Sequence, residues 1–321
     1  MKVTLIGKSK AIKNINKQIQ KFASRKDDIL IIGERGSGKS VVGKKIHYDR
    51  VRGNDTVPLI DVKLHNLGEH ELSAALFGYS EGTPGLPDTS RNSLTDLVEG
   101  GTILIEEIES ANYRNQMKLV HFLNELKELR DSNTDPVNVR IIVTTKDNPV
   151  KLSQRNEIIP ELADHLAPLS TLEIPPLRER KEDIPLLVEH FMNEACKQIG
   201  IQEPIMDINA LSILVNHEWK NNIRELKTVI DRSVVFSSNG MFMLPQDLID
   251  EQSKVTRMLE SVLTGAGQEF DGSLDTIERG LIDSALKRFE FNFSKAAQFL
   301  GMNQHSLEHR AHQLGLVQGK K

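Results

Sequence analysis

A glycine-rich segment, GERGSGKS at residues 33–40, has the residue types and spacing of a phosphate-binding loop. It follows the apolar run ILII and precedes VVGKKIHYDRV, so a strand is expected to enter the loop and a helix to leave it. Glycines let successive backbone N–H groups curl around a phosphate, and the N-terminal end of the helix adds partial positive charge. The sequence therefore predicts that a nucleoside triphosphate binds at this loop.

The same pattern assigns roles to the residues of the loop. Lys39 is expected to reach the terminal phosphates, and the Ser40 hydroxyl is expected to ligate Mg²⁺. A plain glycine-rich turn between a buried strand and a helix is the alternative, and the flanking segments disfavour it. The predicted cofactors are ATP and Mg²⁺, and the predicted cofactor-binding residues are Gly33, Glu34, Arg35, Gly36, Ser37, Gly38, Lys39 and Ser40.

A second acidic element lies at residues 102–110, where the apolar run TILI ends in Glu106 and Glu107. Ligands of parallel sheets bind beyond the carboxyl ends of the strands, which is where this run delivers its two acids. Glu106 is expected to hold the metal with Ser40, and Glu107 is expected to polarise the attacking water. Considered alone, the segment is better explained as a charged boundary between a strand and a helix that has no catalytic role. Its pairing with the glycine-rich loop favours the catalytic interpretation.

The elements that must position these residues follow from hydrophobic periodicity. Between residues 9 and 22, apolar side chains recur at helical spacing, at Ile12, Ile15, Ile19 and Phe22. Beyond ILII, strands are expected at 59–64, 102–107 and 137–145, with helices between them. This alternation predicts an α/β fold in which a parallel sheet is covered on both faces.

From residue 181 onward the strand signals vanish. Three amphipathic segments follow, at 182–199, 208–219 and 222–235. They predict a small all-helical subdomain after the α/β part.

Composition limits the classes of protein that fit. The 321 residues suffice for two or three domains with a sizeable core. A net charge of −4 excludes a globally polybasic nucleic-acid binder, so any DNA contact must be concentrated. A single cysteine, Cys196, excludes a disulfide framework and is expected to be buried. No signal-peptide core is evident and no apolar run approaches about 18 residues, so a cytoplasmic protein without a membrane partner is expected.

These motifs, in this order, resemble the AAA+ domain of bacterial sigma-54 (enhancer-dependent) transcription activators. The resemblance covers nearly the whole chain, and its most specific stretch is PPLRERKEDIP. The other matching segments are LIGKSKAI, GERGSGKS, ALFGYSEG, GGTILIEEIES, VRIIVTT and EWKNNIREL. The resemblance implies an AAA+ P-loop NTPase sheet with a helical lid subdomain, assembled as a hexameric ATPase ring. It also implies catalytic roles for Glu107, for Thr145 as a sensor residue and for Arg224 as the lid arginine that contacts the nucleotide.

The resemblance divides the chain into four parts. Residues 1–176 are predicted to form the AAA+ α/β nucleotide-binding subdomain, and 177–245 the helical lid. A linker is predicted at 246–272, and residues 273–321 are predicted to form an all-α, Fis-type helix-turn-helix domain that binds DNA. Because the AAA+ module starts at residue one, no N-terminal receiver or sensory domain is expected.

The chain departs from the family's pattern at several functional positions. The family inserts a sigma-contacting loop centred on Gly-Ala-Phe-Thr-Gly-Ala, whereas residues 81–91 read EGTPGLPDTSR and contain two stiffening prolines. Lys63 replaces the family's polar switch asparagine, and Glu106 stands where an aspartate is usual. Lys146 follows Thr145 where an asparagine completes the family's sensor.

The arginine fingers of the family are also replaced. The corresponding stretch reads IIPELADHL, which puts Ile159 and His165 at the two finger positions. A trans-acting arginine finger contributes about 10³ to 10⁵ in rate to phosphoryl transfer, so its loss outweighs the extra methylene of Glu106. ATP binding is therefore expected with weak or no hydrolysis. Arg155, four residues upstream of Ile159, is a candidate substitute if its loop bends toward a neighbouring subunit.

Residues 294–316 predict the two short helices of a helix-turn-helix. Ser294 is expected to cap the first helix, Gly301 to make the turn, and residues 304–314 to form the second helix. The buried side is expected to contain Ala297, Leu300, Leu307 and Leu314. The residues predicted to face the major groove of double-stranded DNA are Asn303, Gln304, His305, Ser306, Glu308, His309 and His312.

Alternatives to direct DNA reading remain for this segment. A solvated helical hairpin used only for dimerisation is less consistent with the Ala-Ala pair and the glycine turn. Basic residues only slightly outnumber acidic ones after residue 273, so oligomerisation is expected to supplement affinity. His305, His309 and His312 lie on one helical face, which raises the further hypothesis of a pH-tuned DNA affinity. A metal site there lacks evident further ligands.

Together these observations favour a sequence-specific DNA-binding transcription regulator whose AAA+ module is an ATP-dependent assembly switch. The expected partners are double-stranded DNA, an RNA polymerase holoenzyme that does not depend on sigma-54, and further copies of the chain, from dimer to hexamer. The alternative is an ATP-hydrolysing activator of sigma-54 RNA polymerase, which the retained Glu107, Thr145 and Arg224 support. A P-loop metabolite kinase explains neither the lid motifs nor the C-terminal helices.

Overall fold

The computed structural model describes residues 3–52, 54, 56–79, 81, 90, 92–98, 100–132, 137–237, 240–245, 248, 282, 286, 289, 292–300, 303–314 and 316. The chain separates into two compact units, Met1–Pro245 and Gln246–Lys321. Apart from Leu248, the predicted linker at 246–272 lies outside the described residues, and so does most of the loop at 81–91.

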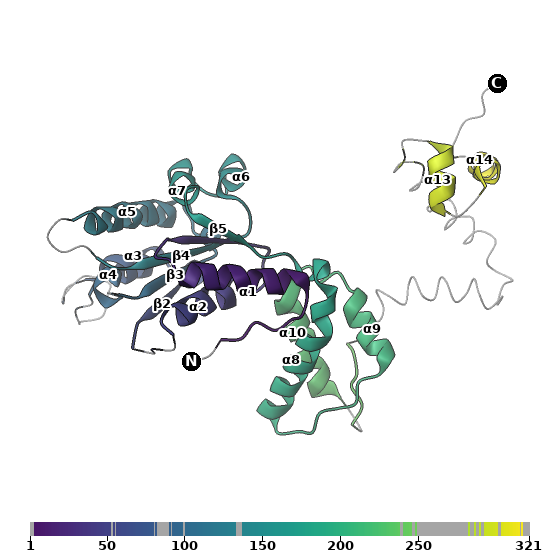
Figure 1. The fold of residues 1–321 in the computed structure, drawn as a ribbon, viewed down its shortest axis with the longest axis horizontal. Coiled ribbons are helices and arrows are strands. Elements are labelled where there is room, and N and C mark those ends of the chain that lie inside the picture. The colour runs from purple at the N-terminus through teal and green to yellow at the C-terminus, as the bar shows by residue number, and fades with distance from the viewer. Residues whose placement is uncertain are drawn as a thin grey trace. The chain divides into compact units, whose positions relative to one another are not determined.

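The first unit is built on a five-stranded parallel sheet (Figure 1). The strand order is β2-β3-β4-β1-β5. The strands are β1 (Ile29–Ile32), β2 (Leu59–Lys63), β3 (Thr102–Glu106), β4 (Arg140–Thr145) and β5 (Ser170–Glu173). The predicted α/β class is confirmed, although β5 was not among the expected strands. Its sequence, STLE, offers a single buried apolar side chain, Leu172, and so gives little strand signal.

Helices cover both faces of the sheet (Figure 1). One face carries α1 (Lys10–Ala23) and α2 (Lys39–Arg50), and the other carries α3 (Glu69–Phe77), α5 (Tyr113–Arg130) and α7 (Pro160–Leu166). Two shorter helices are α4 (Leu94–Leu97) and α6 (Pro149–Gln154).

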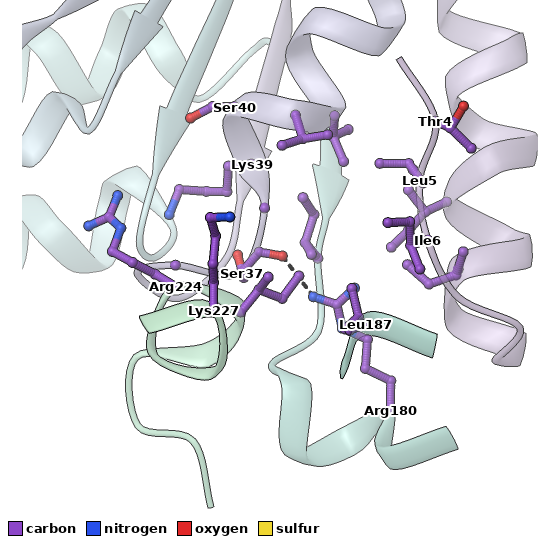
Figure 2. A pocket seen from close by; sticks show the side chains of 18 of the residues that line it. Thr4, Leu5, Ile6, Ser37, Lys39, Ser40, Arg180, Leu187, Arg224 and Lys227 are labelled. Atoms are coloured by element: carbon purple, nitrogen blue, oxygen red, sulfur yellow. Dashed lines mark hydrogen bonds between the residues drawn. The ribbon is translucent and has the colours of Figure 1, made fainter. Parts of the chain in front are cut away.

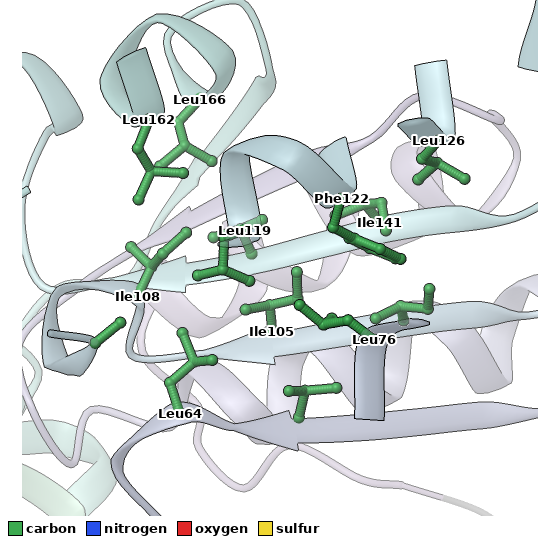
Figure 3. Close-up of a cluster of buried hydrophobic side chains, with 14 of the residues drawn as sticks. Leu64, Leu76, Ile105, Ile108, Leu119, Phe122, Leu126, Ile141, Leu162 and Leu166 are labelled. Atoms are coloured by element: carbon green, nitrogen blue, oxygen red, sulfur yellow. The ribbon is translucent and has the colours of Figure 1, made fainter. Parts of the chain in front are cut away.

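Alternate residues of each central strand supply the two hydrophobic cores. Ile29 and Ile31 pack under α1 and α2, whereas Leu30 points to the opposite core. Because side chains alternate along a strand, fully buried strands appear as continuous apolar runs. Figure 3 shows the second core, in which Leu119 and Phe122 of α5 lie over Ile105 and Ile141 of the sheet.

The first helix confirms the predicted amphipathic pattern. The four apolar residues that recur at helical spacing, Ile12, Ile15, Ile19 and Phe22, are all buried. The Ser9 hydroxyl oxygen caps the helix by accepting a hydrogen bond from the Ile12 backbone N–H at 3.2 Å. The first helix thus packs against α2 and buries its apolar face in the core that also contains Ile29 and Ile31 of β1.

The lid follows the sheet as short turns and three helices. The turns are η3 (Leu177–Glu179) and η4 (Lys181–Asp183), and the helices are α8 (Ile184–Ile199), α9 (Ile208–Asn216) and α10 (Asn222–Phe236). Trp219 is fully buried and its indole N–H donates to the Leu214 carbonyl at 2.8 Å. Cys196 is buried as expected, and burial raises the pKa of its thiol.

The second unit contains α13 (Phe293–Leu300) and α14 (Gln304–Gln313). Ala297 and Leu307 are buried as predicted, together with Ile282, Leu286, Ala296 and Ala311. The expected cap at Ser294 is wrong: Asn292 Oδ1 accepts from the Lys295 backbone N–H at 3.1 Å, and the helix begins at Phe293, two residues earlier than a cap at Ser294 implies. The side chain of Leu300, and Gly301, lie outside the described residues.

No helix in the part of the chain that the structure describes is both long enough and apolar enough to span a membrane.

Candidate nucleotide-binding site

The glycine-rich loop runs from the end of β1 into the first turn of α2, as predicted. Gly36 and Gly38 have φ values of 74° and 103°, a region that residues with a Cβ rarely adopt. A Cβ on Gly36 would also lie 2.1 Å from the Asn221 carbonyl oxygen. The loop therefore needs glycine at position 36 for two reasons, its own backbone conformation and the close approach of the lid.

Lys39 lies under the loop and is almost fully buried. Its ammonium group donates to the Gly33 carbonyl at 2.7 Å and to the Glu34 carbonyl at 3.1 Å. Burial lowers the pKa of this lysine, and the nearby carboxylates of Glu109 and Glu107 oppose that shift. The ammonium group is thus held where phosphate oxygens would replace the two carbonyls as acceptors.

The Glu106 carboxyl group ends β3 beside Ser40. Burial raises the pKa of Glu106, while the Ser40 hydroxyl donates to it and the neighbouring Asp61 carboxyl raises the pKa further. One buried oxygen each of Glu106 and Asp61 has no hydrogen-bond partner. A hydroxyl and two carboxyl groups with unpaired oxygens form the oxygen donor set that Mg²⁺ prefers. Ser40 and Glu106 therefore fit the predicted metal site, and Asp61 was not anticipated.

Glu107 lies at the meeting point of three cationic or titratable side chains. Its Oε2 is 3.3 Å from Arg35 Nη2 and 3.9 Å from His65 Nδ1, and its Oε1 is 3.6 Å from Arg224 Nη2. The residue has a left-handed φ of 54°, and its backbone N–H donates to Thr144 Oγ1 at 2.9 Å. The structure thus brings together three residues that the sequence singled out, Arg35, Glu107 and Arg224.

The sensor strand β4 ends beside the same site. The buried Thr145 hydroxyl donates to the Asp147 carbonyl at 3.2 Å, and the Thr145 carbonyl accepts from the Gly33 backbone N–H at 3.1 Å. Lys146 pairs with Glu157. Glu109, in the turn η2 (Ile108–Ser110), lies near Lys39, and burial raises the pKa of its carboxyl.

The lid is hydrogen-bonded directly to the phosphate loop. The two terminal guanidinium nitrogens of Arg178, Nη1 and Nη2, donate to the Glu34 carboxylate at 2.8 and 2.6 Å. The Asn222 amide donates to Glu34 Oε2 at 3.1 Å and to the Arg35 carbonyl at 3.0 Å. Arg180, which is buried, donates to the Ser37 carbonyl at 2.7 Å. Sequence motifs pointed to the loop and to the lid separately, but these contacts between them were not foreseen.

A pocket of about 370 Å³ opens between the loop, the N-terminal segment and the lid. Figure 2 shows Leu5 and Ile6 on one side, with Lys39, Arg224 and Lys227 on the other. Further apolar side chains of the lid line it, among them Leu187, Phe191 and Ile223. Apolar walls next to a phosphate loop suit a planar base. Sequence patterns did not identify these residues, because no motif marks the wall that faces a base.

The two positions aligned with arginine fingers offer no guanidinium. Ile159 is buried in the core and its backbone N–H donates to Gln116 Oε1 at 2.8 Å. His165 is half-buried on α7. Arg155 lies 3.2 Å from Asp147 and lines a second cleft, of about 610 Å³, that also contains Arg35 and Glu107. The Arg155 side chain therefore lies on the cleft of its own chain.

The predicted DNA-contacting residues lie on and before α14. Glu308 is half-buried and accepts from the Gln304 side-chain amide at 2.9 Å, and Asn303 caps the helix by accepting from the His305 backbone N–H at 2.9 Å. The remaining residues are exposed, as Asn303 is: Gln304, His305, Ser306, His309 and His312. The helix thus presents a polar face opposite Leu307 and Ala311, which are buried.

Three family models match successive parts of the chain. Residues 5–171 match the Sigma-54 interaction domain, and residues 178–260 match the AAA+ ATPase lid domain. Residues 273–310 match the bacterial regulatory protein, Fis family.

Curated relatives are similar along almost the whole chain. Regulatory protein AtoC of Escherichia coli K12 is 30% identical over 97% of this chain and 68% of its own length. The Psp operon transcriptional activator of the same organism is 29% identical over 95% of both chains. The transcriptional regulatory protein XylR of Pseudomonas putida is 29% identical over 96% of this chain, which spans only 56% of that relative.

Solved structures show the same fold. A crystal structure of NtrX from Brucella abortus in complex with ATP has a TM-score of 0.65 and 24% identity. It covers 98% of this chain and 70% of its own. The parallel sheet, the lid match and this likeness together confirm the predicted fold class.

Proposed function

The chain belongs to the family of bacterial regulators that carry a sigma-54 interaction domain, and we propose that it is a sequence-specific DNA-binding transcription regulator that uses ATP as an assembly switch. ATP binding favours self-association of the AAA+ module, between dimer and hexamer, in the cytoplasm. Self-association in turn strengthens DNA binding, because several linked helix-turn-helix units engage one duplex. Hydrolysis is weak or absent, and the partner is an RNA polymerase holoenzyme that does not depend on sigma-54.

The observation that carries this proposal is the convergence of Lys39, Glu107 and Arg224 on one pocket between the loop and the lid. The loop supplies backbone N–H groups and an ammonium group for phosphates, and the lid supplies a guanidinium. Because Arg224 belongs to α10, an occupied site ties the position of the lid to the presence of nucleotide. A switch requires such a link between ligand and structure.

Magnesium fits the acidic end of the pocket. Ser40, Glu106 and Asp61 would hold the ion, with the unpaired buried carboxyl oxygens directed to it. Bound Mg²⁺ would offset the charge of the phosphate oxygens. Glu107, which the structure pairs with arginines, is then the group left to orient a water.

Weak hydrolysis is expected because a neighbouring subunit brings no arginine to the γ-phosphate at the two finger positions. Ile159 is buried and apolar, and His165 is half-buried, so the two finger positions place no permanent positive charge on the γ-phosphate. The loss of such a charge costs about 10³ to 10⁵ in rate. Thr145 remains next to the loop as a sensor of the bound state.

A second candidate is an ATP-hydrolysing activator of sigma-54 RNA polymerase. The match of residues 5–171 to the Sigma-54 interaction domain favours it, as do Glu107, Thr145 and Arg224 at the site. In that case, the divergent loop at 81–91 would contact the sigma factor through side chains other than the family's aromatic and threonine tip.

The ATPase rate of the purified chain, measured over a concentration series with and without specific DNA, separates the two candidates. The assembly switch predicts saturable ATP binding and nucleotide-dependent self-association with little phosphate release at any concentration. Cooperative turnover that rises as the chain assembles would favour the activator. A chain whose assembly ignores ATP would contradict the switch.

A further inference from the structure

We propose that the Arg35 side chain is the specificity-determining group for the third phosphate of the nucleotide. In the structure it pairs with Glu107, and when a triphosphate binds it moves to the γ-phosphate. The inference rests on the proposed ATP binding and adds how the site distinguishes ATP from ADP.

The position of Arg35 suits this role. It lies in the loop between Gly33 and Gly36, and its side chain is 63% exposed. It lines the 610 Å³ cleft together with Glu107, next to the carboxyl ends of β3 and β4. This is the end of the loop toward which Glu107 would orient water, and therefore the end at which a γ-phosphate is expected.

The pair between Arg35 and Glu107 is weak enough to exchange. Its closest N–O distance is 3.3 Å, and water reaches most of the guanidinium. Such partly exposed ion pairs contribute little to stability. A γ-phosphate carries more negative charge than one carboxylate and presents oxygens that a guanidinium binds in a bidentate manner. The triphosphate therefore competes successfully for Arg35, whereas a diphosphate places no group at this end of the site.

Glu107 keeps two neighbouring side chains, one guanidinium and one imidazole, when Arg35 leaves. Arg224 lies 3.6 Å from Oε1, and His65, in the turn η1 (Leu64–Asn66), lies 3.9 Å from Oε2. The sequence suggested that the polar switch residue after β2 had become Lys63, which is exposed at the strand end. The structure places His65 against Glu107 instead. The Oε2 atom that Arg35 releases thus remains next to a polar side chain.

Three further arginines around the loop have partners other than Glu107. Arg178 is bound by both oxygens of Glu34, and the buried Arg180 donates to the Ser37 carbonyl. Arg155 pairs with Asp147. Arg224 is also exposed and also lies beside Glu107, but it belongs to α10 of the lid and its N–O distance to Glu107 is longer, at 3.6 Å. Arg35 is the arginine of the loop itself that pairs with Glu107.

The experiment compares dissociation constants of the full chain for the Mg²⁺ complexes of AMP-PNP, a triphosphate analogue that resists hydrolysis, and of ADP. Arg35→Ala is expected to weaken AMP-PNP binding about tenfold, which corresponds to about 1.4 kcal/mol, and to change ADP binding less than about twofold. Arg35→Lys, which keeps the charge but not the fork of donors, is expected to lie between wild type and alanine.

Arg114→Ala is the matched control. Arg114 also forms an exposed ion pair, 3.2 Å from Glu69, and it lines neither of the clefts described above. It is expected to leave both constants unchanged. Equal loss of AMP-PNP and ADP binding in Arg35→Ala, or no loss of either, would overturn the inference while leaving the proposed function in place. A wild-type chain that binds neither nucleotide would overturn the proposed function and the inference with it.

Discussion

At the scale of single residues, the Lys39 ammonium group and the Glu107 carboxylate both have partners within the site. Lys39 donates to two carbonyls of its own loop, and Glu107 faces two arginines. Buried or half-buried charges need such partners, because an unpaired charge away from water is costly. We therefore propose that nucleotide binding is an exchange of partners, in which phosphate oxygens accept from the donors that two carbonyls and a carboxylate now accept from.

Replacing Lys39 tests the phosphate end of this exchange. Lys39→Ala removes the buried ammonium group, and we expect a loss of about 2–3 kcal/mol in ATP binding, or roughly 30- to 150-fold in affinity. Isothermal titration with Mg²⁺-ATP measures the loss. Lys45→Ala, in the same helix α2, serves as a control that should bind normally, because the half-buried Lys45 pairs with Asp49 and lines neither cleft. Unchanged affinity in Lys39→Ala would contradict the assigned site.

The residue types of the loop could be predicted from the sequence because the pattern encodes a local structure. The partners of Glu107 could not be predicted from the sequence, because Arg35, His65 and Arg224 come from three segments that are far apart in the chain. The helix cap at Ser294 was predicted wrongly because two nearby residues, Asn292 and Ser294, are both good capping residues. Only the backbone geometry shows that Asn292 caps the helix.

At the scale of elements, the lid and the phosphate loop behave as one hydrogen-bonded assembly. Glu34 of the loop accepts from Arg178 and Asn222, and the Ile223 backbone N–H donates to the Gly36 carbonyl at 3.0 Å. If the lid moves, then either these hydrogen bonds break or the loop moves together with the lid. The element that holds phosphate is thereby coupled to the helices that line the other side of the pocket.

The coupling between Glu34 and Arg178 predicts an acid dependence. The hydrogen bond from Arg178 is the main cause that lowers the pKa of Glu34 below its ordinary value of 4.5. A depressed carboxyl pKa adds stability above the unfolded value, which is lost as pH falls through the folded value. Glu34→Gln is therefore expected to lower the Tm slightly near pH 7 and to match wild type once pH falls below the folded pKa. Scanning calorimetry from pH 7 to 3 measures this, and parallel curves would contradict it.

Asp183 joins the N-terminal segment to the start of the lid. This fully buried carboxylate accepts from the Lys8 backbone N–H, the Ser9 backbone N–H and the Ser9 hydroxyl, each at 2.7 Å. Asp183→Ala leaves those donors unsatisfied, so we expect a loss of about 3 kcal/mol in the free energy of unfolding. Urea denaturation measures it. Asp164→Ala, at an exposed position of α7, is expected to change stability by less than about 0.5 kcal/mol.

The central elements of the sheet could be predicted because buried strands and amphipathic helices leave strong periodic signals. The edge strand β5 and the short helices α6 and α7 could not be predicted from the sequence. Each is only a few residues long and therefore leaves a weak periodic signal. Their positions depend on packing against β1 and α5, which local sequence does not encode.

At the scale of the whole molecule, the two expected functions belong to different units. The first unit contains the proposed nucleotide pocket, and the second contains the segment that matches the Fis family. The second unit has a core of small and branched apolar residues beneath α14. Its polar face offers few fixed charges. Under the proposed function, we therefore expect specific DNA binding to come from hydrogen bonds to base edges and from several copies acting together.

A substitution on α14 tests whether this face reads DNA. Gln304 is exposed near the start of the helix, and Gln304→Ala is expected to cost about 1–3 kcal/mol of binding to an operator selected from random duplexes, with little effect on non-specific DNA. Gln313→Ala, at the exposed far end of the same helix, is the control and should bind like wild type. Equal binding by both variants would contradict the assigned orientation.

The central claim is that this chain holds ATP without rapidly splitting it. The most direct measurement isolates the protein after incubation with Mg²⁺ and radiolabelled ATP at an assembling concentration, denatures it and separates the released nucleotides. We predict that ATP makes up most of the bound nucleotide after many minutes, because the Ile159 and His165 positions supply no arginine. Recovery of ADP as the main species within seconds would contradict the claim.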